Sequence, residues 1–101
     1  MKFTINFGRN KSGNNQTDEE VKRHDNAMRN LQKRESDLKR EVEDTMREMD
    51  NMQRTNRLDP QRRNQLQKKI DDIKGMISRV MTEMQHEREN HRKRMESFHR
   101  R

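Results

Sequence analysis

Histidine and glutamate recur near the carboxyl end of the chain, where residues 86–91 read HERENH. Two histidines on one helical face with a glutamate between them can hold a catalytic zinc ion. That site needs histidines four residues apart, whereas His86 and His91 are five apart and point about 140° away from each other on a helix. We therefore expect polar or surface histidines here, no metal site and no cofactor.

Carboxylates are plentiful, but each lies among lysines and arginines without neighbours that could form a pocket. General acid–base catalysis needs a shaped, desolvated site. Gly8 and Gly13 are neither spaced nor flanked as a phosphate-binding loop. The chain has no cysteine, which excludes disulfides and thiolate metal sites. We predict that the protein is not an enzyme.

The composition predicts a small protein with a narrow core. Hydrophobic residues make up 24% of the 101 residues and charged residues 43%, which is too little apolar material for a layered core. Such a composition approaches that of disordered chains, but here the apolar residues keep a regular period. Because the chain lacks cysteine, a signal-like start and a long apolar segment, we expect an intracellular, cytoplasmic protein, with peripheral membrane association as an additional expectation.

The elements that must position these side chains are two long helices. Apolar residues recur every three or four positions over 21–52 and 66–98, and Asp59-Pro60 separates the two runs. Thr17, followed by Asp-Glu-Glu, has the pattern of a helix-capping box. Asp59 can cap the second helix, with Pro60 at its first position. These signals predict a flexible basic and apolar arm over 1–16 and a hairpin over 17–101, with helix 17–57, turn 56–59 and helix 60–99.

A seven-residue period in both runs predicts an all-α fold, namely an antiparallel two-helix coiled-coil hairpin that is oligomeric. Facing residues then have numbers that sum to 115, which places Val42 on Ile73 and His24 on His91. The predicted core and self-association residues are Val21, Met28, Leu31, Leu38, Val42, Met49, Leu66, Ile70, Ile73, Ile77, Val80 and Met84.

Four methionines flank this stripe instead of lying in it: Met46, Met76, Met81 and Met95. One interpretation is that they lie over the seam of the hairpin. The other is that they bind further helices, because flexible thioether side chains suit imperfectly matched partners. We expect a homo-oligomer or a helical protein partner.

The net charge of +7 is concentrated in blocks, which favour an anionic surface as partner. Residues 54–69 hold six lysines or arginines against one acid, Asp59. In the arm, apolar residues alternate with polar ones next to cations, as in segments that enter a membrane interface. The predicted contacts to an anionic surface are Lys2, Phe3, Ile5, Phe7, Arg9, Lys11, Arg54, Arg57, Arg62, Arg63, Arg92, Lys93 and Arg94.

Three stretches within residues 1–35 resemble the start of ESCRT-III membrane-remodelling filament subunits: FGRNK at 7–11, DEE at 18–20 and AMRNLQKRE at 27–35. The resemblance implies a short membrane-contacting segment, a long helical hairpin and polymerisation on anionic membranes. It would make Phe3, Ile5 and Phe7 the inserting residues, with Arg9 and Lys11 touching headgroups. The chain departs from this family in its first helix, which is not net basic.

We therefore expect a non-enzymatic coiled-coil assembly or interaction protein that oligomerises or docks on helical partners. Its basic ends would contact an anionic surface, with a membrane as the candidate surface. The alternatives are sequence-nonspecific nucleic-acid binding, whose affinity falls steeply with salt, and a structural scaffold component. Interleaved acids and the scarcity of aromatic residues for base stacking favour the first function over nucleic-acid binding.

Overall fold

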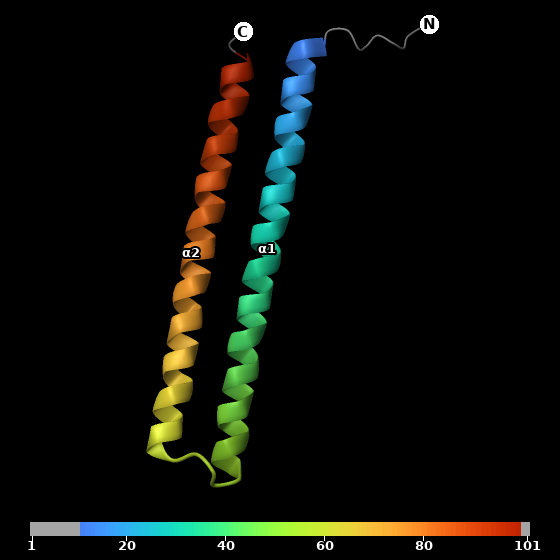
Figure 1. Cartoon of the computed structure of the whole chain (residues 1–101). Helices are drawn as coiled ribbons and strands as arrows, with labels where there is room; N and C mark the ends of the chain where they lie inside the picture. Colours follow the sequence, from blue (N-terminus) through green and yellow to red (C-terminus); the bar gives the residue numbers. More distant parts are fainter. Residues whose placement is uncertain (1–10, 100–101) are drawn as a thin grey trace, which may run out of the picture. The chain divides into compact units, whose positions relative to one another are not determined.

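The computed structural model describes residues 11–99, with side chains described for residues 15–99. In this part the chain forms two helices and no strand: α1 (Lys11–Arg54) and α2 (Pro60–His99), joined by residues 55–59 (Figure 1). The helices pack against each other as a hairpin, which confirms the predicted all-helical hairpin. Residues 1–10 of the predicted arm lie outside the described part.

The first helix begins at Lys11, so the predicted start at Thr17 and the predicted arm over residues 11–16 are wrong. A capping sequence stabilises a helix end, but it does not stop a helix when the preceding residues can also adopt helical dihedral angles. No proline precedes Thr17, and Gly13 inside a helix costs only about 1 kcal/mol. Glu20, the expected partner in the capping box, faces α2 instead.

The first helix ends at Arg54, three residues before the predicted end. Asn56 adopts a left-handed backbone conformation with φ of 59°. Its N–H donates to the carbonyl of Gln53 at 3.2 Å, and the N–H of Arg57 donates to the carbonyl of Met52 at 2.8 Å. This pair of bonds is a Schellman motif, which satisfies carbonyls at a helix end. Asparagine tolerates the left-handed conformation better than most residues, and the helix therefore ends here.

The second helix begins as predicted, at Pro60 after Asp59. The Asp59 carboxylate accepts a hydrogen bond from the N–H of Arg62 at 2.7 Å, and its carbonyl accepts one from the N–H of Arg63 at 2.9 Å. The first of these bonds satisfies an N–H group that has no carbonyl partner in the first turn of a helix, and the second is the first backbone bond of α2. Proline at the first position loses nothing, because its missing N–H would have no helical partner there.

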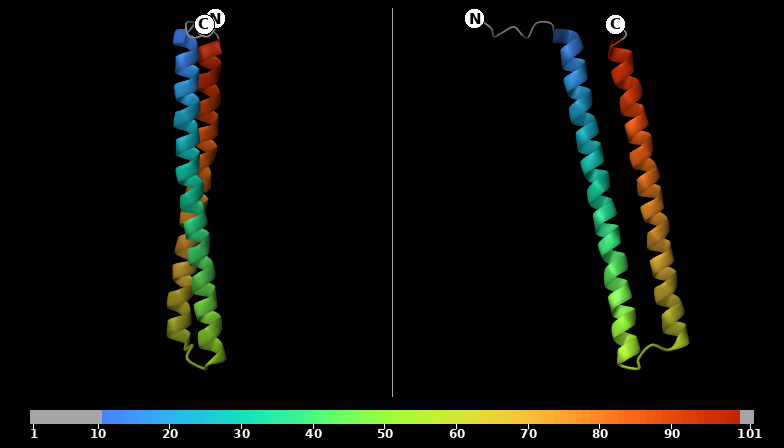
Figure 2. Two further views of the ribbon diagram at one scale, coloured as in Figure 1. Left: turned by 90° about the vertical axis from the view of Figure 1, so that its right-hand side faces the viewer. Right: turned by 180° about the vertical axis from the view of Figure 1, so that it is seen from behind.

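The chain divides into two compact units. The terminal unit contains residues 11–30 of α1 and residues 84–99 of α2. The turn unit contains residues 31–83, including the connection between the helices. Within each unit a segment of α1 lies alongside a segment of α2, as two further views show (Figure 2).

The core of the turn unit is a cluster of Val42, Ile70 and Ile73, against which Leu38 and Ile77 pack. Val42 and Ile73 are thus together, as the heptad pattern predicted. Other residues of the predicted core differ in their burial. Met49 also packs on the cluster, Leu66 and Val80 are buried, and Leu31 is half-buried. In the terminal unit, Met28 and Met84 are buried.

Val21 does not belong to the core, although the heptad pattern placed it there. It is 37% exposed in the terminal unit. The predicted register sets Val21 opposite Arg94, and a long cation cannot bury a valine as an apolar partner does. At Val21 the apolar seam therefore gives way to polar contacts, whereas Met28 and Met84 of the same unit are buried.

Candidate interaction surfaces

The terminal unit contains an ionic network that links its two helical segments. On α1, positions 20, 23 and 24 share one helical face, because residues three and four apart are neighbours on a helix. On α2, positions 87, 91 and 94 do the same. The side chains of the network are Glu20, Arg23, His24, Glu87, His91 and Arg94.

Glu20 is the most deeply buried member, with 5% of its side chain exposed. Its carboxylate accepts two hydrogen bonds from the Arg23 guanidinium, from Nε at 2.9 Å and Nη2 at 2.8 Å. His91 Nδ1 lies 2.9 Å from it and Arg94 Nη1 lies 3.3 Å from it. The bonds from Arg23, with smaller contributions from His91 and Arg94, outweigh burial and lower the pKa of Glu20 to about 2.

Glu87 accepts hydrogen bonds from the other edge of the Arg23 guanidinium. Arg23 Nη2 and Nη1 donate to its carboxylate at 2.7 and 3.1 Å, and His24 Nδ1 lies 2.8 Å from it. The hydrogen bonds from Arg23 outweigh burial and lower the pKa of Glu87, with a smaller contribution from His24. The two carboxylates in turn raise the pKa of Arg23. Arg23 therefore joins a carboxylate of α1 to a carboxylate of α2.

His24 and His91 lie face to face between these carboxylates. Their ring centroids are 4.0 Å apart and their planes are inclined by 12°, which confirms the predicted pairing of these two residues. A carboxylate can only accept hydrogen bonds at neutral pH, so Nδ1 of each ring must carry the proton. Among residues 15–99, no buried side-chain nitrogen or oxygen lacks a hydrogen-bond partner.

Sequence reasoning found only part of this network. The heptad pattern places His24, Glu87, His91 and Arg94 in the seam but gives Arg23 no role, and the capping sequence at Thr17 assigns Glu20 to the helix start. The spacing of Glu20 and Arg23 was a usable signal, because residues three apart on a helix often form an ion pair. The burial of that pair depends on the neighbouring helix.

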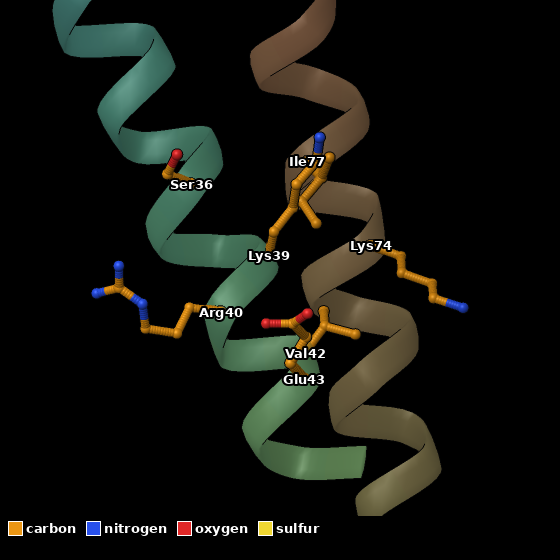
Figure 3. Close-up of a pocket in the computed structure, with 7 residues that line it drawn as sticks. All are labelled: Ser36, Lys39, Arg40, Val42, Glu43, Lys74 and Ile77. Carbon is orange, nitrogen blue, oxygen red and sulfur yellow. The ribbon is translucent and has the colours of Figure 1, made fainter. Parts of the chain in front are cut away.

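The turn unit carries an open groove of about 510 Å³ between its helical segments (Figure 3). Val42 and Ile77 supply the apolar lining. In Figure 3, Lys39 extends between the helices, whereas Arg40 and Lys74 extend outward on either side. The groove is lined by Ser36, Lys39, Arg40, Val42, Glu43, Lys74 and Ile77. Three cationic side chains and one acidic side chain thus surround Val42 and Ile77.

Three of the four predicted flanking methionines are exposed, and all three lie in the turn unit. The exposed fraction is 45% for Met46, 38% for Met76 and 53% for Met81. Met95, in the terminal unit, is half-buried. Each of the first three therefore has apolar surface that a further helix can cover.

The predicted contacts to an anionic surface fall into three groups. Four are engaged by acids: Arg54 pairs with Asp50, Arg62 with Glu48 at 3.1 Å, Arg92 with Glu89 and Glu96, and Arg94 with Glu20. Within the described part of the chain, Arg57, Arg63 and Lys93 form no ion pair. Lys2, Phe3, Ile5, Phe7 and Arg9 lie outside the described residues, and the side chain of Lys11 is not described.

The described residues contain no group of three or more histidine, aspartate or glutamate side chains arranged to hold a metal ion. Neither α1 nor α2 combines enough length with enough hydrophobicity to cross a membrane. No protein-family model, curated protein or solved structure matches this chain. The resemblance of residues 1–35 to ESCRT-III subunits therefore stays a prediction.

Proposed function

We propose that this chain is a non-enzymatic interaction protein, an antiparallel coiled-coil hairpin that oligomerises or docks on helical partners. The observation that carries the proposal is the exposure of Met46, Met76 and Met81 beside a narrow core. A protein with so few apolar residues gains most of its stability by burying them. Large exposed thioethers suit binding to another helix.

Analytical ultracentrifugation tests the self-association part of this proposal. We expect species heavier than the 12.5 kDa chain at micromolar concentrations, with helicity measured by circular dichroism on the same samples. A fully helical protein that stays monomeric at high micromolar concentration would contradict oligomerisation. Docking on a different helical protein would then be the part of the proposal that survives.

We also propose that the basic turn contacts an anionic surface. Arg57, Arg63, Lys68 and Lys69 lie close together in sequence around the turn, and none of them forms an ion pair within the described residues. The N-terminal segment adds Phe3 and Phe7 as candidates for membrane insertion, in line with the ESCRT-III resemblance. We expect binding to vesicles that contain phosphatidylserine, and weaker binding at higher salt.

Nucleic-acid binding is the second candidate, favoured by the same unpaired cations of the turn. Parallel co-sedimentation with anionic vesicles and with duplex DNA, at two salt concentrations, separates the two candidates. Phe3→Asp together with Phe7→Asp should weaken vesicle binding and leave DNA binding unchanged if the segment inserts. Unchanged vesicle binding by this variant would exclude insertion.

A further inference from the structure

The groove of the turn unit lies on the same side of the hairpin as two of the exposed methionines. With Val42 and Ile77 at the a position of the heptad, Met46 and Met81 occupy the e position on α1 and α2, which in this register borders one side of the seam. Lys39 and Lys74, also e residues, line the groove together. On the opposite side, the g residues Glu48 and Arg62 form an ion pair.

In the predicted register, the groove and the two methionines lie in one row along this side of the seam, with Lys39 and Lys74 between the methionines. In the predicted register, Met46 and Met81 are about 12 helical residues apart along the seam, or about 18 Å. The groove, with Val42 and Ile77 in its lining, lies between them. This length corresponds to three or four turns of a bound helix.

We propose that this surface binds an amphipathic helix of a different protein, whose apolar stripe is flanked by aspartates and glutamates. The proposal rests on the docking part of the proposed function and specifies the chemistry of the partner. The apolar stripe of that helix covers Val42, Ile77 and the two methionines, as in other complexes in which a helix lies in a groove. Its acids face Lys39, Arg40 and Lys74.

The charges of the groove select this occupant over a second copy of the chain. Three cations against Glu43 give the groove a net charge of +2. A two-fold dimer through this groove would place the same cations against each other. A second copy also has no matching stripe elsewhere on its turn unit, where Met76 is the other exposed large hydrophobic residue.

Two synthetic helical peptides of about 14 residues test the proposal by fluorescence anisotropy on the full chain. Both carry leucines spaced three and four residues apart, flanked by glutamates in one peptide and by lysines in the other. We expect the acidic peptide to bind at least about tenfold more tightly. Replacing Lys39, Arg40 and Lys74 by glutamate should reverse this preference.

Matched variants control for nonspecific attraction. Replacing Arg63, Lys68 and Lys69 by glutamate changes the net charge equally outside the groove, and should reduce affinity for the acidic peptide by no more than about threefold. Met46→Ser with Met81→Ser should weaken binding about tenfold without any change of charge. Met76→Ser, on the opposite side of the seam, should leave binding unchanged. Circular dichroism establishes that each variant is folded.

Three results would overturn the proposal. One is that the acidic peptide does not bind. Another is that the two triple charge variants lose the same affinity for that peptide. The third is that Met76→Ser weakens binding as much as Met46→Ser with Met81→Ser. Ultracentrifugation could show that the wild-type chain self-associates and that, among these variants, only Met46→Ser with Met81→Ser abolishes the self-association. A second copy would then occupy the surface instead. In that case this inference fails while the proposed interaction function stands.

Discussion

The imidazole rings of His24 and His91 stack in the terminal unit, with centroids 4.0 Å apart. Each ring also bonds to a carboxylate of the opposite helix: His24 to Glu87, and His91 to Glu20. Each helix thus supplies one histidine and one glutamate to a reciprocal arrangement. A shift of one helix by a single residue would turn these side chains away from their partners, so the arrangement defines the register of this unit.

The first prediction concerns the most buried acid of this network. Glu20→Gln removes the negative charge that Arg23, His91 and Arg94 share, while it keeps the size of the side chain. We expect the free energy of unfolding to fall by about 1–3 kcal/mol, as measured by urea unfolding followed at 222 nm. The fall should lie at the low end of this range, because Arg23 is 38% exposed and water screens its charge.

Glu19→Gln is the matched control for this variant. Glu19 is adjacent, exposed and outside the ionic network. Its replacement should change the free energy of unfolding by less than about 0.5 kcal/mol. Equal effects of the two substitutions would show that net charge, and not the network, determines the result.

The second prediction is a loss of stability in acid. Because the pKa of Glu20 is about 2 in the folded protein and 4.5 ordinarily, the folded state binds fewer protons than the unfolded state between these values. The stabilisation that the ionised Glu20 gives to the folded state is complete above pH 4.5 and is lost as the pH falls towards 2. Glu87, whose pKa is also lowered, acts in the same direction.

Urea unfolding at pH 7, 4.5 and 3 measures this dependence. We expect the contribution of Glu20 to the free energy of unfolding to fall by about 2 kcal/mol as the pH falls from 7 to 3. The variant with both Glu20→Gln and Glu87→Gln should lose less stability than the wild type between pH 4.5 and 3. Parallel pH profiles of the two proteins would contradict the lowered pKa values.

The third prediction concerns Asn56, whose positive φ ends α1. Asn56→Gly should keep or slightly raise stability, because glycine adopts this conformation without steric cost. Asn56→Ala should lower the free energy of unfolding by about 1 kcal/mol, since its Cβ is strained there. Thermal unfolding of the three proteins checks the order Gly, Asn, Ala. A more stable alanine variant would mean that the turn does not require the left-handed conformation.

Sequence patterns predicted those parts of the fold that depend on local chemistry. Pro60 and Asp59 identify the start of α2, because their effect on a helix end needs no distant residue. The heptad period placed Val42 and Ile73 together, because an apolar stripe can be buried only against another stripe. The start of α1 was missed, since a capping sequence at Thr17 does not exclude an earlier start.

The ionic network was harder to predict because its energetics depend on tertiary contacts. Glu20 is an ordinary helix-start acid in the sequence, and its contacts with His91 and Arg94 come from the other helix. Arg23 lies outside the apolar stripe and gains its role by reaching two carboxylates at once. The groove is likewise a property of two packed helices, and no single stretch of sequence contains it.

The last prediction is that Gly75→Ala stabilises the protein. Gly75 lies in the middle of α2 with a φ that is not positive, and a Cβ atom there would meet no other atom within 4 Å. Alanine restricts the unfolded chain more than glycine does, and it favours a helix by about 1 kcal/mol. We expect the midpoint of thermal unfolding to rise by about 4–8 °C.

Gly75→Ser provides a graded control, because serine favours a helix less than alanine and more than glycine. The midpoints of thermal unfolding should therefore rise in the order Gly, Ser, Ala. A lower midpoint for both variants would mean that a side chain at this position meets an obstacle, such as a second chain packed on the outer face of α2. Ultracentrifugation of the same variants would then show whether that obstacle is another copy of the protein.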